Sequence, residues 1–82
     1  MGGGNVPTLK RFDQFKICVF ADDHPPPHFH VIGRGFKATI LFETLSLDVG
    51  ECPRKVFAEA VTWAAVNREA LEEAWRNLNE RS

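Results

Sequence analysis

The chain has 82 residues, of which ten are Lys or Arg and eleven are Asp or Glu, and its formal net charge is −1. This length allows one domain, and the charge balance excludes a protein built mainly to neutralise phosphates, although it leaves room for a local basic patch. No apolar run approaches the ~18 residues that a membrane span requires. We expect a flexible leader at 1–6 and a single domain at 7–80.

Four segments rich in β-branched and aromatic residues predict a small sheet. Between the first two, the prolines Pro25–Pro27 exclude regular structure, because they lack amide donors and favour an extended conformation. A tight hairpin is indicated at Gly33-Arg34-Gly35. The predicted strands are 16–20, 28–32, 36–42 and, either as a fourth strand or as a continuation of the third, 44–49.

Alternation along the two hairpin strands predicts which face each side chain occupies. Phe29 and Val31 point to one side of the sheet, and their histidine neighbours point to the other. A two-residue hairpin loop brings the apolar side chains of both strands together, whereas a three-residue loop mixes the faces, so we predict the shorter loop. The face turned away from the helices is then expected to hold His28, His30, Lys37 and Thr39.

Helical periodicity follows the break at 50–53. Pro53 suits a first helical turn, and an apolar stripe over 56–64 predicts a helix. Asn67 is expected to interrupt the helix and to cap a second one, whose apolar stripe includes a buried Trp75. The predicted fold class is α+β: a small antiparallel sheet of three to four strands followed by two C-terminal helices packed on one face.

The two cysteines, Cys18 and Cys52, have neither metal-binding spacing nor the pattern of a disulfide framework. Reduced thiols are typical of cytosolic proteins. We therefore expect a cytoplasmic protein.

Residues 23–31 read Asp-His-Pro-Pro-Pro-His-Phe-His-Val. This motif resembles the DHxPPHFHV signature of a bacterial family, the domain of unknown function 4160, and the resemblance runs from about Pro7 to Trp75. It implies an association with toxin–antitoxin-like gene pairs, and so a small protein partner encoded nearby. The resemblance implies no particular activity.

The His-rich segment fits two chemical interpretations. In RNA cleavage without a metal, His28 and His30 would act as general acid and base, and Lys37 or Arg34 would stabilise the phosphate charge. In a metal site, most simply for zinc, His28 and His30 would be two ligands on one strand face, completed by His24 or Asp23. We predict that the metal ligands are His24, His28 and His30.

Two further interpretations need no such chemistry. A stiff proline segment loses little entropy on binding, so the region could bind a protein partner. Its binding residues would be Asp23, His24, Pro26, Phe29 and Arg34. Alternatively, the segment is a structural turn in which Asp23 accepts amide hydrogen bonds. These interpretations leave open whether the protein is an enzyme.

Overall fold

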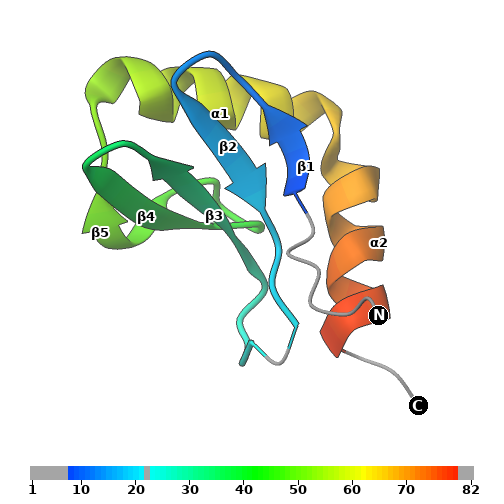
Figure 1. Cartoon of the computed structure of the whole chain (residues 1–82). Helices are drawn as coiled ribbons and strands as arrows, with labels where there is room; N and C mark the ends of the chain where they lie inside the picture. Colours follow the sequence, from blue (N-terminus) through cyan, green and yellow to red (C-terminus); the bar gives the residue numbers. More distant parts are fainter. Residues whose placement is uncertain (1–7, 22, 80–82) are drawn as a thin grey trace, which may run out of the picture.

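In the described part of the chain, five antiparallel strands form one sheet, in the order β1-β2-β3-β4-β5, and two helices follow it (Figure 1). The structure is a computed structural model that describes residues 8–21 and 23–79, so the predicted leader at 1–6 lies outside the described residues. The elements are β1 Thr8–Arg11, β2 Phe15–Cys18, β3 His28–Gly33, β4 Phe36–Leu41, β5 Leu47–Glu51, α1 Arg54–Val66 and α2 Arg68–Asn79.

The α+β class and the order of sheet and helices are confirmed, but the sheet has five strands rather than three to four. β1 was not predicted because Thr8–Arg11 contains one β-branched residue and no aromatic one, which is too weak a strand signal. It pairs with β2, where Thr8 lies opposite Cys18. β1 therefore extends the sheet by pairing with β2 through the backbone.

β5 is a separate strand and not a continuation of β4. The chain reverses after β4, where the Leu41 amide donates to the Ser46 carbonyl at 3.0 Å. Leu45 lies in the left-handed region, with φ 56°. That conformation is usually taken by Gly or Asn, so a leucine gives no turn signal in the sequence.

The hairpin between β3 and β4 has the predicted two-residue loop. Gly33 pairs with Phe36 and His30 pairs with Thr39, which leaves Arg34 and Gly35 as the loop. Phe29 is fully buried, as the alternation required. The predicted register is therefore confirmed.

Both helices bury their apolar stripes against the core face of the sheet. α2 turns steeply away from α1 and runs toward the end of the molecule where the loop before β3 lies (Figure 1). Trp75 of α2 is 3% exposed and packs edge-on against Phe42, with 6.0 Å between ring centroids. The core consists of Phe15, Ile17, Val19, Phe29, Val31, Ile40, Phe42, Val56, Ala60, Ala64, Leu71 and Trp75.

Asn67 separates the two helices, as predicted. Its carbonyl accepts the first amide bond of α2, from Leu71, at 3.1 Å. Its side chain, however, donates backward to the Trp63 carbonyl at 2.9 Å, so it satisfies the end of α1 rather than the start of α2. Pro53 precedes α1 instead of lying in its first turn.

The expectation that both histidines lie away from the helices is wrong for His28. Its side chain alternates as predicted, but it is only 8% exposed and its ring lies 5.3 Å from that of Trp75. His28 is the first residue of β3, and α2 runs past this end of the strand. The helix therefore covers His28, whereas His30 remains partly exposed.

No helix among the described residues is long and apolar enough to cross a membrane.

Replacing Trp75 by alanine should lower the free energy of unfolding by about 3–5 kcal/mol, because a large buried side chain is lost and a cavity remains. Urea unfolding followed by circular dichroism measures this loss. The Trp63→Ala variant is the matched control and should lose less, since Trp63 is only partly buried. A loss below about 1 kcal/mol for Trp75→Ala is typical of a surface residue and would contradict the burial of Trp75 in the core.

Gly50 should tolerate alanine less well than Gly35, although both have positive φ, 79° and 83°. A left-handed backbone costs an L-residue about 1–2 kcal/mol in either place. At Gly50 the added Cβ would also collide with the carbonyl oxygen of Lys37, whereas at Gly35 nothing lies within 4 Å. Chemical unfolding of both alanine variants checks this order, and an equal or smaller loss for Gly50→Ala contradicts it.

Candidate functional site

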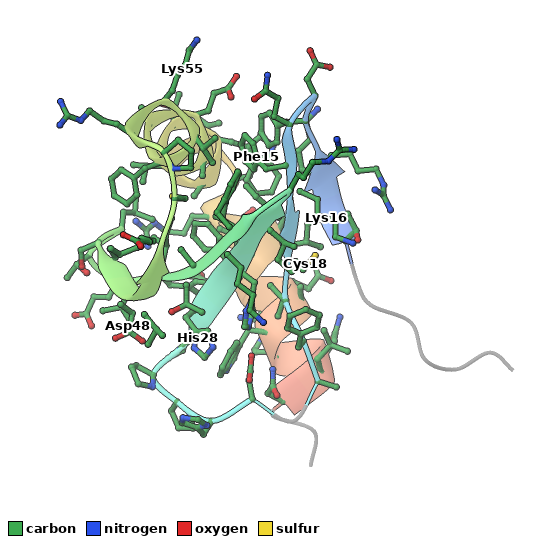
Figure 2. The ribbon with its side chains drawn as sticks, turned by 60° about the vertical axis from the view of Figure 1, so that its left-hand side comes forward. Phe15, Lys16, Cys18, His28, Asp48 and Lys55 are labelled. Carbon is green, nitrogen blue, oxygen red and sulfur yellow. The ribbon has the colours of Figure 1, made fainter. Side chains whose placement is uncertain are left out.

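One carboxylate oxygen brings together two histidines at the start of β3. Asp23 Oδ2 lies 3.1 Å from His28 Nε2 and 3.0 Å from His30 Nε2. These three atoms, all of types that can bind a metal, lie within 4.8 Å of one another. Figure 2 shows His28 at the end of the sheet, beside the loop that leads into it. We refer to Asp23, His28 and His30 as the Asp-His-His cluster.

This cluster is formed by β3 together with the loop through Pro25–Pro27, which we call the proline loop. Alternation along β3 places His28 and His30 on the same face, with ring centroids 5.2 Å apart. The chain before β3 passes through Pro25–Pro27 and leaves Asp23 beside the two rings. The cluster therefore lies within eight consecutive residues of the chain.

The Pro26 carbonyl determines how His28 carries its proton. His28 Nδ1 lies 2.8 Å from this oxygen, and a carbonyl oxygen only accepts hydrogen bonds, so Nδ1 must carry the hydrogen. In the neutral ring, Nε2 then presents a lone pair toward Asp23 Oδ2. Two acceptors 3.1 Å apart repel each other unless a proton or a cation lies between them.

His30 has no such conflict. Its Nε2 can carry the hydrogen of a neutral ring and donate it to Asp23 Oδ2 at 3.0 Å. The conflict thus concerns His28 Nε2 and the carboxylate alone.

Aromatic side chains hold both rings in place. The ring of Trp75 lies 5.3 Å from that of His28, and Phe20 packs edge-on against His30 at 4.4 Å. The side chains of the cluster are 10%, 18% and 23% exposed for His28, His30 and Asp23. Partial burial strengthens electrostatic interactions among them, because less water screens the charges.

Several residues expected at the site lie elsewhere. His24 is exposed and is not part of the cluster. Arg34 lies in the hairpin loop, at the opposite end of β3 from His28. Phe29 is fully buried in the core and is unavailable to a binding surface. Pro26 takes part through its backbone carbonyl.

Lys37 lies on the open face of the sheet rather than in the cluster. It lines a hollow of about 430 Å³, together with His30, Phe20 and Val49. A larger hollow, of about 530 Å³, lies between the proline loop and α2 and is lined by Pro26, Pro27 and Trp75 among others. The first hollow therefore borders the cluster at His30.

The cysteines contribute nothing to the cluster. Both are free thiols. Cys18 is buried, with its sulfur 3.7 Å from the Thr8 hydroxyl, and burial raises the pKa of the Cys52 thiol. A raised pKa disfavours the thiolate that reactions and metal binding require.

Three residues around the cluster were not predicted: Phe20, Trp75 and Asn79. The side-chain amide of Asn79 accepts a hydrogen bond from the backbone amide of Asp23 and donates one to the backbone carbonyl of Phe20. Asn79 lies 56 positions beyond Asp23, and nothing in the sequence pattern connects the two. Trp75 was recognised as a core residue, but its contact with His28 follows from the path of α2.

Comparison with known families gives one result. A family model described as a domain of unknown function (DUF4160) matches residues 15–76, which is well over half of the chain. Comparison with the curated proteins and with the solved structures finds no match. The match includes the whole Asp-His-His cluster and the two elements beside it, β3 and most of α2. The chain belongs to the DUF4160 family, as the motif at 23–31 predicted.

Proposed function

We propose that this protein binds one divalent transition-metal ion of the zinc class through Asp23 Oδ2, His28 Nε2 and His30 Nε2. Imidazole nitrogens and a carboxylate oxygen are donors that zinc accepts at about 2.0–2.2 Å. The proximity of these three atoms supports the proposal. Compared with the ligand set expected from the sequence, Asp23 takes the place of His24.

The contact between His28 Nδ1 and the Pro26 carbonyl is the observation that carries this proposal. A histidine that binds a metal through one nitrogen commonly donates from the other nitrogen to a carbonyl or a carboxylate, which fixes the ring and its tautomer. Here that arrangement aims the Nε2 lone pair at the carboxylate. A cation shared by the two atoms turns their repulsion into coordination.

The main competing interpretation is an ion pair without a metal. If His28 takes a second proton, Nε2 donates to Asp23 and the same distances result. The cluster would then be a structural turn, with Asp23 as its acceptor. The two interpretations differ in a measurable way, because only the metal site needs both rings to be neutral.

Three protein ligands leave a coordination position for water or a substrate, which is the pattern of catalytic rather than structural zinc sites. This supports, as a further part of the proposal, an enzymatic use of the site. The hollow lined by His30 borders the cluster and offers space for such a ligand.

RNA cleavage by His28 and His30 alone stays a prediction, and the geometry favours it less. Both Nε2 atoms lie against the same carboxylate oxygen, where a phosphate would have to enter. A negative carboxylate there repels a phosphate. The partner encoded nearby and the cytoplasmic location also stay predictions.

Removing a ligand should abolish tight zinc binding. We expect Asp23→Ala and His30→Ala to weaken zinc at least 100-fold relative to the wild-type protein, because each loses one of three donor atoms. Competition titration with a chromophoric chelator measures the affinity. His24→Ala is the matched control, since His24 is an exposed histidine of the same loop, and it should bind like wild type.

Two results would contradict this expectation. One is a wild-type protein that binds no zinc at neutral pH, and the other is a loss in His24→Ala as large as that in His30→Ala. Cleavage of RNA that persists in a chelator and disappears in His30→Ala would instead favour acid–base catalysis by the histidines.

Zinc affinity should fall as the pH is lowered, because protons compete with the metal for the imidazole nitrogens. Each ring that must lose a proton to bind contributes about tenfold per pH unit once it is protonated. Calorimetric titration in buffers of different ionisation enthalpy should also detect proton release on binding. An affinity that does not change between pH 7.5 and pH 5.5, about the range over which histidines ordinarily titrate, would exclude histidine coordination.

A further inference from the structure

The last residue of α2 makes two hydrogen bonds to the loop that carries Asp23. The Asp23 amide donates to Asn79 Oδ1 at 2.8 Å. Asn79 Nδ2 donates to the Phe20 carbonyl at 3.1 Å. One carboxamide therefore contacts the chain both before Asp23 and at Asp23 itself.

We infer that Asn79 is a positioning residue for the metal site, an inference that rests on the proposed function. Asp23 is the one ligand of the three that does not lie on a strand, so β3 does not position it. Its backbone is held by Asn79, and the direction of its carboxylate depends on that backbone. Asn79 thereby determines the position of Asp23 Oδ2 relative to the two histidine nitrogens.

Asn79 is also linked to His30, because Asn79 bonds to Phe20 and Phe20 packs against His30. The Phe20 carbonyl accepts from Asn79, and the Phe20 ring packs edge-on against His30 at 4.4 Å between centroids. A change at Asn79 thus disturbs both the carboxylate ligand and the support of one imidazole. Trp75, one turn earlier on α2, packs against the other imidazole.

The chemistry of this contact requires an amide side chain. The Asp23 N–H needs an acceptor and the Phe20 carbonyl needs a donor, and a carboxamide offers both at one site. An aspartate at this position would keep the acceptor but would place a negative oxygen against the Phe20 carbonyl. An alanine would lose both bonds.

Zinc affinity and the absorption spectrum of the cobalt(II) protein test this role in the full chain. Asn79→Ala should weaken zinc about 10–100-fold, the usual effect of removing an outer-shell partner. Its cobalt spectrum should change in the visible region because Asp23 no longer holds its place. Asn79→Asp should also weaken zinc, although it keeps the size of the side chain. Asn77→Ala, an exposed asparagine on the same turn, is the matched control and should retain both the affinity and the spectrum of wild type.

The free energy of unfolding of each metal-free variant is measured alongside, and zinc is titrated under conditions in which every variant is folded. A general loss of stability then leaves the cobalt spectrum of the folded protein unchanged, whereas a misplaced carboxylate alters it. If wild type binds zinc and Asn79→Ala matches it in affinity and spectrum, the positioning role is overturned and the proposed metal site stands. If wild type binds neither zinc nor cobalt, both inferences are overturned.

Discussion

The contact between His28 and the Pro26 carbonyl is the constraint on which this site depends. It commits the only hydrogen of a neutral His28 ring to the backbone, and it leaves a lone pair facing the Asp23 carboxylate 3.1 Å away. That arrangement is unfavourable by itself and favourable around a cation. The proline loop, which returns the chain to β3, and Trp75, which covers the ring, both serve to keep His28 in this orientation.

α2 connects the helical layer to this site. Trp75 is a core residue and also packs against His28, while Asn79 holds the loop of Asp23 from the end of the same helix. The site therefore combines a short local motif with two residues from the C-terminal helix. Because α2 packs its apolar stripe into the core through Leu71 and Trp75, the geometry of the cluster is tied to the folding of the whole domain.

The hairpin register followed from the sequence because apolar and polar residues alternate from His28 to Val31 in β3, and a two-residue loop brings the apolar side chains of both strands to one face. β1 did not follow, since its pairing is made by the backbone of a short, mostly polar segment. The choice of Asp23 over His24 as the third member of the cluster was also beyond sequence reasoning. Both residues precede the same prolines, and the loop is held at Asp23 by a hydrogen bond that its amide donates to Asn79, far along the chain.

The most direct test is a crystal structure of the zinc-loaded protein with anomalous diffraction at the zinc edge. We predict one zinc ion about 2.0–2.2 Å from Asp23 Oδ2, His28 Nε2 and His30 Nε2, with the His28 Nδ1 contact to the Pro26 carbonyl retained. An anomalous peak at His24, or a cluster in which His28 and Asp23 still touch directly in excess zinc, would contradict it.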